Sequence, residues 1–239
     1  MIVFYITGTS SGIGKAITEK ALQIDDSIVY GFSRTNGIQN PKYHHTSIDL
    51  AKIEDVKNID LIVHPDAYKV ILINNSGTIG DIKPVGKLSN DSIENLFNIN
   101  TISPSIIANK FIEAYQKVNT SLVIINISSG AARHPIESWA TYCASKAAID
   151  MLSQVIQAEN GYDLKGKLRV FSIAPGIVNT NMQKMVRESN PKDFPHHEKF
   201  VGYYTKGQLV STDSVATKIF EIIDKPERHQ NVLIDVRQL

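Results

Sequence analysis

The sequence has little of what marks secreted, membrane or nucleic-acid-binding proteins. Its single cysteine, Cys143, excludes an internal disulfide and is typical of a reducing compartment. No apolar run approaches the ~18 residues of a membrane span, and strand-like residues from Ile2 favour a chain without a secretory signal. A net charge of +1 provides no attraction to nucleic acid or to an anionic membrane. We therefore expect a cytoplasmic protein that binds neither.

What is present fits one α/β domain. A chain of 239 residues with 42% hydrophobic residues can bury one sizeable core, and apolar runs of strand length alternate with patterns of helical spacing. Pro104 is expected to kink or break the chain locally, and residues 35–42 contain too many turn residues for a helix. The predicted strands are 2–6, 28–32, 43–48, 70–73, 122–127, 168–173 and 231–236, and the predicted helices are 14–22, 51–67, 89–100, 104–118, 142–159 and 213–224.

A glycine-rich turn follows the first predicted strand. Thr7 to Gly14 reads TGTSSGIG, in which Gly8, Gly12 and Gly14 have the spacing G-x-x-x-G-x-G between a strand and a helix. Glycines there let the backbone approach a pyrophosphate, which the free N–H groups and the dipole of the helix N-terminus stabilise. An ordinary turn of glycine and serine is the alternative, but the position at the first junction of strand and helix favours a dinucleotide site.

The end of the second predicted strand indicates which dinucleotide binds. A carboxylate at this place would hold the ribose 2′-hydroxyl of NAD, but no Asp or Glu occurs from Ser27 to Ile48. Arg34 follows the strand instead, and a guanidinium can bind a 2′-phosphate through two hydrogen bonds. We therefore predict a preference for NADP(H), with a merely solvated Arg34 as the alternative. The adjacent His44 and His45 would point to opposite faces of a strand, so no metal site is predicted.

Three side chains with catalytic potential lie between Ile125 and Lys146. Tyr142 and Lys146 are four residues apart, so on a helix they share one face. A phenol has a pKa of ~10, and a neighbouring cation favours the phenolate, so the pair can pass a proton near neutral pH. Ser129 follows a strand-like run, and its hydroxyl can donate to a carbonyl. Tyr142 is thus a candidate general acid, although a Y-x-x-x-K pair alone is common on surface helices.

Further candidates lie near the ends of other predicted strands. The turn NNSG, from Asn74 to Gly77, suits the adenosine side of a cofactor. Asn100 is a polar residue in an apolar helix, where it is either functional or a buried amide with satisfied hydrogen bonds. The mixed segment 181–208 follows the carboxyl end of a strand and predicts a lid over a pocket.

Together these residues resemble the short-chain dehydrogenase/reductase family over essentially the whole chain. TGTSSGIG, NNSG, Asn100, Ser129, the pair of Tyr142 and Lys146, and PGIVNT occur in the family's order and at its spacing. The resemblance implies one NADP(H)-binding domain over residues 1–239, with a three-layer Rossmann fold: a doubly wound, seven-stranded parallel sheet with helices on both faces. It also implies a homodimer or homotetramer built through the helices around Asn100 and Tyr142.

The family's residue roles carry over to the matching positions. The resemblance implies that Tyr142 protonates the substrate oxygen, Ser129 orients the carbonyl, and Lys146 lowers the tyrosine pKa and holds the nicotinamide ribose. It further implies that Asn100 supports a water relay to Lys146. The backbone around Val178 and the Thr180 hydroxyl would place the carboxamide. The implied cofactor-binding set is Gly8, Ser10, Ser11, Gly12, Ile13, Gly14, Arg34, Asp49, Leu50, Asn75, Ser76, Gly77, Tyr142, Lys146, Pro175, Gly176, Val178 and Thr180.

Some positions depart from the family pattern or narrow it. Ser76 stands where alanine is usual, and Ser11 stands where many NADP-preferring members have a basic residue. Within the family, the nearest resemblance is to sepiapterin reductases and to benzil reductases that form (S)-benzoin. Trp139 is a candidate aromatic wall for flat substrates, with core packing as the alternative. Gln238 stands where sepiapterin reductases have the acid that anchors the pterin.

These resemblances lead us to expect an NADPH-dependent carbonyl reductase that transfers hydride to a ketone or vicinal diketone. A sepiapterin reductase is the second expectation, because the amide of Gln238 carries no charge. A 3-oxoacyl carrier-protein reductase or another alcohol dehydrogenase would share the same motifs. A binding protein that senses NADP is the alternative from another class, but such a protein would be expected to lose part of the catalytic set.

Overall fold

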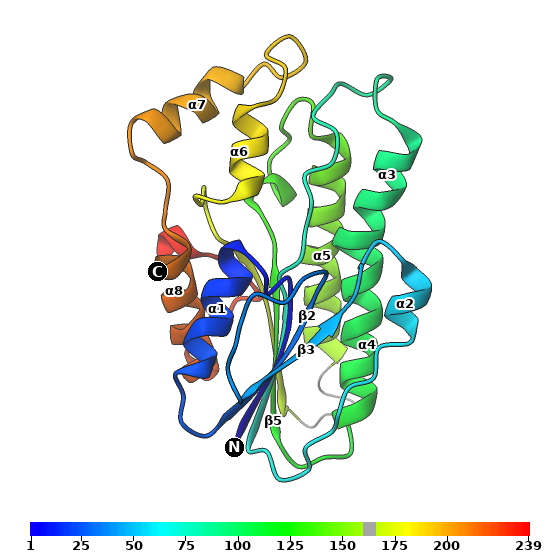
Figure 1. The fold of residues 1–239 in the computed structure, drawn as a ribbon, viewed down its shortest axis with the longest axis vertical. Coiled ribbons are helices and arrows are strands. Elements are labelled where there is room, and N and C mark those ends of the chain that lie inside the picture. Colours follow the sequence, from blue (N-terminus) through cyan, green and yellow to red (C-terminus); the bar gives the residue numbers. More distant parts are fainter. Residues whose placement is uncertain (160–165) are drawn as a thin grey trace.

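Seven strands form one parallel sheet in the computed structural model, which describes residues 1–159 and 166–239. The strand order is β3-β2-β1-β4-β5-β6-β7, which confirms the predicted doubly wound sheet (Figure 1). The strands are β1 (Ile2–Thr7), β2 (Ser27–Ser33), β3 (Tyr43–Ser47), β4 (Lys69–Asn74), β5 (Ser121–Ile127), β6 (Leu168–Ala174) and β7 (Leu233–Asp235). The order reverses between β1 and β4, and ligands of this architecture bind beyond the carboxyl ends of the strands at such a point.

Helices cover both faces of the sheet because successive side chains of each strand point to opposite faces. Phe4 of β1 belongs to the core under α1 and α8, whereas its neighbour Tyr5 belongs to the core under α4. Figure 1 shows α1 and α8 on one side of the sheet and α4 and α5 on the other. The helices are α1 (Gly12–Leu22), α2 (Ile53–Lys57), α3 (Asn90–Phe97), α4 (Ser103–Tyr115), α5 (Ala140–Glu159), α6 (Asn181–Arg187), α7 (His197–Thr205) and α8 (Thr212–Asp224).

The predicted helix over residues 51–67 is wrong beyond its first turn and a half. Only α2 is helical, and the chain from residue 58 to residue 68 is irregular. Two buried tyrosines explain the difference. Their hydroxyls form hydrogen bonds with backbone groups of this segment that would otherwise bond to each other within a helix. Tyr5 donates to the Ile62 carbonyl at 2.5 Å, and the His64 N–H donates to the Tyr115 hydroxyl at 3.1 Å. Tertiary contacts therefore override the local helical pattern here.

The chain runs continuously from α3 into α4 through a wide π-helical turn at Asn98–Ile102. Ser89 caps α3 as predicted, since its side chain accepts from the Ser92 N–H. Pro104, which was expected to kink or break the helix, is the second residue of α4 and does not interrupt that helix. The irregularity falls just before it and contains Asn100. Single π-helical turns are frequent at functional sites.

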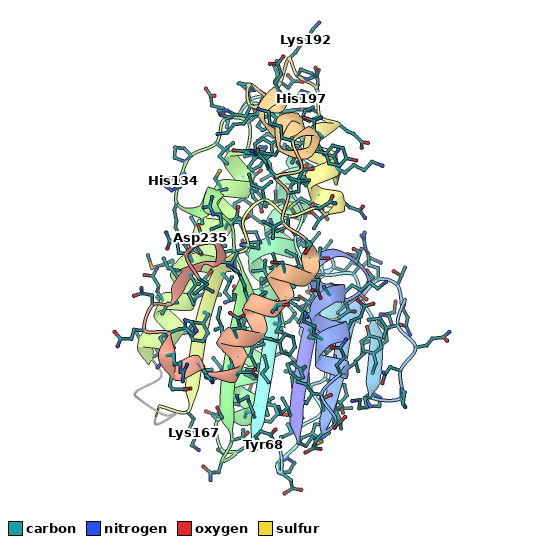
Figure 2. All side chains as sticks on the ribbon, turned by 90° about the vertical axis from the view of Figure 1, so that its left-hand side faces the viewer. Tyr68, His134, Lys167, Lys192, His197 and Asp235 are labelled. Carbon is teal, nitrogen blue, oxygen red and sulfur yellow. The ribbon has the colours of Figure 1, made fainter. Side chains whose placement is uncertain are left out.

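Residues 181–208, predicted as a lid, contain α6 and α7. In Figure 2, Lys192 and His197 mark this segment at one end of the molecule, while Tyr68 and Lys167 mark the opposite end of the strands. The last strand is shorter than the predicted 231–236, because the chain turns into a short 3-10 helix at Val236–Gln238. Among the described helices, none has the length and apolarity that crossing a bilayer requires.

Candidate active site

The turn between β1 and α1 is shaped to receive a phosphate. Gly8 and Gly12 have φ angles of +76° and +59°, which residues with a side chain rarely adopt. A Cβ atom at Gly14 would lie 2.2 Å from the Gly8 carbonyl oxygen, so only glycine fits there. Ser11 at the N-cap makes no side-chain capping bond within the described residues, which leaves the first N–H groups of α1 to an anion. The turn fits the pyrophosphate of a dinucleotide.

The segment after β4 supports this turn from the neighbouring strand. The Asn75 amide donates to the carbonyls of Thr7 and Gly8 at 3.0 and 3.3 Å, and the Ser76 N–H donates to the Thr7 hydroxyl at 3.0 Å. The side-chain amide of Asn75 therefore holds the turn in shape. A Cβ atom at Gly77 would lie 3.5 Å from Lys146 Nζ, so the backbone of this segment directly borders Lys146.

No helix occurs between β2 and β3, as the turn residues of 35–42 predicted. Arg34 directly follows β2, and its side chain is exposed with no ion-pair partner among the described residues. Ser47 donates to the Arg34 carbonyl at 3.2 Å, which holds the backbone at this point. Asp49 caps the next turn by accepting from the Ala51 N–H, and Leu50 is buried. The Arg34 guanidinium is therefore free to meet an anion.

The loop after β6 closes the opposite side. Gly176 has a φ of +79°, and the chain then pairs Val178 with Val210 in a parallel bridge. Thr180 forms the N-cap of α6, and its methyl group would lie 3.6 Å from a Cβ at Gly12. The start of the lid segment thus faces the phosphate-binding turn. The predicted positions Pro175 to Thr180 and the glycine turn border one space.

Tyr142, Lys146 and Ser129 come together at the carboxyl end of β5. Tyr142 and Lys146 lie on the buried face of α5 and are 6% and 4% exposed. Ser129 is the N-cap of the short 3-10 helix η2 (Gly130–Ala132), and it lies close enough to Tyr142 to lower the pKa of the phenol. Lys146 Nζ donates to the Ile127 carbonyl at 2.8 Å and lies 5.8 Å from the centre of the Tyr142 ring. The three groups predicted from their spacing therefore share one site.

Burial acts on the pKa of both members of the pair. Burial raises the pKa of Tyr142 to about 12, and the bond to Ser129 lowers it only in part. Burial also lowers the pKa of Lys146 to about 8, against the charge of Asp150. The ammonium lies beside the ring and donates to the Ile127 carbonyl, and its lowering of the tyrosine pKa stays a prediction. Tyr142 is consequently held as a protonated phenol.

Asn100 is a buried amide whose hydrogen bonds are satisfied. Its Oδ1 accepts from the Thr78 N–H at 2.8 Å, while its Nδ2 donates to the Thr78 carbonyl at 2.9 Å and to the Ser145 hydroxyl at 3.1 Å. A cavity of about the size of one water molecule lies between Asn100, Lys146 and Asn74. The Oδ1 atom of Asn74 is buried and has no hydrogen-bond partner among the described residues. The cavity therefore offers polar partners to a water beside the lysine.

Aromatic side chains of residues 181–208 pack against Trp139, which directly precedes α5. Trp139 stacks on Phe194 with ring centres 5.5 Å apart, and it contacts Phe200 at 5.2 Å and the Tyr142 ring at 5.6 Å. Trp139 is 6% exposed, so it is both part of a core and a neighbour of the catalytic phenol. Met182 of α6 lies with its sulfur 3.9 Å from the Tyr142 hydroxyl. Sequence reasoning missed Met182, Phe194 and Phe200, since no local pattern links them to Tyr142.

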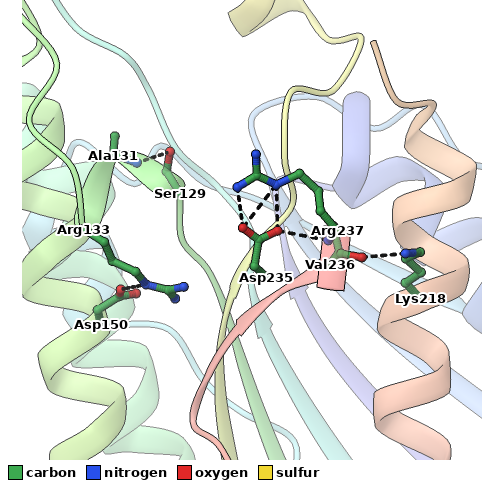
Figure 3. A network of polar contacts seen from close by, with 8 residues as sticks. All are labelled: Ser129, Ala131, Arg133, Asp150, Lys218, Asp235, Val236 and Arg237. Atoms are coloured by element: carbon green, nitrogen blue, oxygen red, sulfur yellow. Dashed lines mark hydrogen bonds and ion pairs between the residues drawn. The ribbon is translucent and has the colours of Figure 1, made fainter. Parts of the chain in front are cut away.

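The C-terminal segment presents an acid that sequence reasoning overlooked. Gln238, predicted to face the substrate, is exposed in the last 3-10 helix. Asp235, at the end of β7, accepts from Arg237 Nε at 2.9 and 3.1 Å (Figure 3). The Arg237 side chain lies against Gly176, because a Cβ there would be 3.5 Å from its Cγ. The ion pair of Asp235 and Arg237 therefore borders the loop after β6.

A comparison with protein families decides how this site is classified. Residues 2–191 match the family described as short chain dehydrogenase. The chain belongs to the short-chain dehydrogenase family. Members of this family bind a nicotinamide cofactor, and the glycine turn between β1 and α1 has the shape that its pyrophosphate needs.

Individual relatives confirm the resemblance to two kinds of reductase. The chain is 31% identical over 231 residues to a benzil reductase ((S)-benzoin forming) from Bacillus subtilis, with 94% of each chain covered. It is 28% identical over 255 residues to a sepiapterin reductase from Meriones unguiculatus, with 98% of this chain and 95% of the relative covered. A solved short chain dehydrogenase/reductase from Saccharomyces cerevisiae has a TM-score of 0.85 at 22% identity, covering 99% of this chain and 96% of that one. This last comparison shows the shared fold.

Proposed function

We propose that the protein is an NADPH-dependent carbonyl reductase that acts on aromatic or vicinal diketones. The observation that carries this proposal is the position of Tyr142, which lies beside Ser129 and whose ring packs edge-on against Trp139 of the aromatic cluster of Trp139, Phe194 and Phe200. A proton donor beside an aromatic wall suits a flat carbonyl compound. The 31% identity to a benzil reductase supports the same substrate class.

In the proposed reaction, Tyr142 donates its proton to the substrate oxygen while the Ser129 hydroxyl donates a hydrogen bond to the same atom. Burial holds the Tyr142 pKa at about 12, so the phenol is loaded with its proton at neutral pH. The Lys146 ammonium, beside the ring, stabilises the phenolate that forms. The bound nicotinamide supplies the hydride to the carbonyl carbon.

The small cavity beside Lys146 supports a route for returning the proton. A water there can accept from the ammonium and donate to the Asn74 Oδ1 atom, which has no other partner in the described part of the chain. Asn100 links the backbone of Thr78 to Ser145 on α5, and these hydrogen bonds fix one wall of the cavity. This arrangement is the proposed role of Asn100.

Replacement of Tyr142 tests the mechanism. Tyr142→Phe removes the proton donor, so turnover should fall by about 10²- to 10⁴-fold, whereas NADPH binding followed by fluorescence should change little. Tyr68→Phe is the matched control, because Tyr68 is 58% exposed at the opposite end of the sheet. Loss of NADPH absorbance is followed with benzil, an aliphatic 1,2-dione and sepiapterin. Near-normal turnover by Tyr142→Phe would contradict the mechanism.

A pterin side chain is the second candidate substrate, and Asp235 favours it. The Asp235 carboxylate is 11% exposed and lies at the end of β7, near the substrate side of Gly176. A carboxylate can accept hydrogen bonds from the amino and ring N–H groups of a pterin. Arg237 occupies it in this structure, so a pterin would have to compete with an ion pair. Turnover of sepiapterin that disappears in Asp235→Asn, with diketone turnover retained, would favour this candidate.

We also propose that the protein is a cytoplasmic homo-oligomer that pairs through α4 and α5. Met151 and Val155 of α5 are 59% and 44% exposed, and Ile102 at the start of α4 is 41% exposed. An unpartnered apolar helix face is the kind of surface that a second copy of the chain covers. Met151→Lys should reduce the mass measured by light scattering, and Met185→Lys, at an equally exposed methionine of α6, should not. Unchanged mass in Met151→Lys would exclude this interface.

A further inference from the structure

Asp150 is a buried carboxylate that the proposed reaction does not use. It lies on α5, four residues after Lys146, and its side chain is 7% exposed. One oxygen accepts from the Ser172 hydroxyl of β6 at 2.6 Å, and the other accepts from Arg133 Nε at 3.1 Å. A charge buried to this extent is costly unless it is paired and hydrogen-bonded. Each oxygen of Asp150 thus has one donor, a hydroxyl or a guanidinium.

The partner of Asp150 comes from the turn that carries Ser129. Arg133 ends the 3-10 helix η2, which begins at Ser129, and its N–H donates to the Gly130 carbonyl at 3.1 Å. Figure 3 shows Arg133 reaching from this turn to Asp150 on α5. The ion pair therefore ties the turn that holds the carbonyl-orienting hydroxyl to the helix that holds Tyr142 and Lys146.

The charge of Asp150 also acts on Lys146. Residues four apart on a helix lie one above the other, so the carboxylate and the ammonium share the buried face of α5. Burial lowers the pKa of Lys146 to about 8, and Asp150 is the charge that opposes this lowering. Arg133 offsets part of the Asp150 charge, and Asp235 on β7 acts on Arg133 from its other side. The Tyr142 phenol, which Cys143 adjoins, is a further titratable group beside the lysine.

We propose that Asp150 is a positioning residue of the active site, which holds the Ser129 turn through Arg133 and presents its negative charge to Lys146 on the buried face of α5. The kinetic part of this inference rests on the proposed carbonyl reduction. The electrostatic part does not, because the protonation of Lys146 can be followed without any substrate.

Two isosteric or near-isosteric variants separate the charge of Asp150 from its hydrogen bonds. Asp150→Asn removes the charge and should lower the midpoint of the Lys146 titration, followed by NMR of the lysine side chain, by about one pH unit. Ser172→Ala is the matched control, since it removes one hydrogen bond to the carboxylate and keeps the charge. Lys146→Arg identifies the lysine signal. An unchanged midpoint in Asp150→Asn would overturn the proposal.

A variant of the partner gives a shift of opposite sign and guards against misfolding of Asp150→Asn. Arg133 is 28% exposed, so Arg133→Gln should fold, and by leaving the Asp150 charge unopposed it should raise the Lys146 midpoint. If diketone reduction is observed, Asp150→Asn should lower kcat about tenfold above pH 8, with KM little changed. If the wild type turns over no carbonyl, but Asp150→Asn lowers and Arg133→Gln raises the Lys146 midpoint, the proposed reaction is refuted and the role of Asp150 stands. If the wild type reduces a carbonyl, but neither variant shifts the Lys146 midpoint, only the role of Asp150 is refuted.

Discussion

Replacing Arg34 offers the sharpest test of the proposed cofactor preference. The guanidinium is exposed, has no ion pair among the described residues, and follows β2 at the open adenosine edge of the site. A hydrogen bond from a cation to a phosphate contributes about 1.5–3 kcal/mol in proteins, and solvent screening at an exposed site favours the lower half of that range. A loss of about 2 kcal/mol corresponds to a roughly thirtyfold weaker affinity for NADPH. Affinity for NADH, which has no 2′-phosphate, should hardly change.

The assay compares kcat/KM for NADPH and NADH in the wild type and in Arg34→Leu. Arg228→Leu is the matched control, because Arg228 is an equally exposed arginine in the 3-10 helix that precedes β7, at the other end of the strands. The ratio of the two kcat/KM values should fall about thirtyfold in Arg34→Leu, since only the phosphate contact is lost. A ratio that stays constant, or a parallel loss for both cofactors, would refute the role of Arg34 in recognising the 2′-phosphate.

Two other predictions follow from the site. Carbonyl reduction should slow as pH rises through about 8, because the Lys146 ammonium, with a pKa of about 8, loses its proton there, while Tyr142, with a pKa of about 12, keeps its own. Lys146→Arg should remove this alkaline fall, and a fall that persists would belong to another group. Gly14→Ala should abolish cofactor binding, measured by NADPH fluorescence, since its Cβ would lie 2.2 Å from a carbonyl oxygen. Gly202→Ala, which meets nothing within 4 Å, is the control, and equal binding by both variants would contradict the turn geometry.

Features that depend on a short stretch of chain were predictable from the sequence. The shape of the glycine turn from Gly8 to Gly14 is one example. Only glycine can adopt its left-handed φ angles without strain and allow the close approach at Gly14, so the glycines themselves indicate the turn. The pairing of Tyr142 with Lys146 follows from helical spacing alone, and α5 places both on its buried face. The near-continuous apolar runs likewise predict strands that are buried on both faces of a parallel sheet.

Features that depend on distant residues were not predictable in the same way. The pattern of residues 51–67 favours a helix, yet the hydroxyls of Tyr5 and Tyr115, far away in the sequence, bond to that backbone in an extended form. Met182 and the phenylalanines of the lid segment meet Tyr142 only after the chain folds over the sheet.

The sequence by itself determined the family, the parallel sheet and the glycine turn, and it named the candidate catalytic side chains, because these follow from backbone geometry and short spacings. Only the tertiary structure decided the charge states within the site. Burial raises the pKa of Tyr142 and lowers that of Lys146, and the spacing of the two residues indicates neither shift. The carboxylate of Asp150 and the arginine that pairs with it come from separate elements, α5 and the turn after β5. Desolvation and the pairing of buried charges are properties of the packed molecule, and no local pattern of residues encodes them.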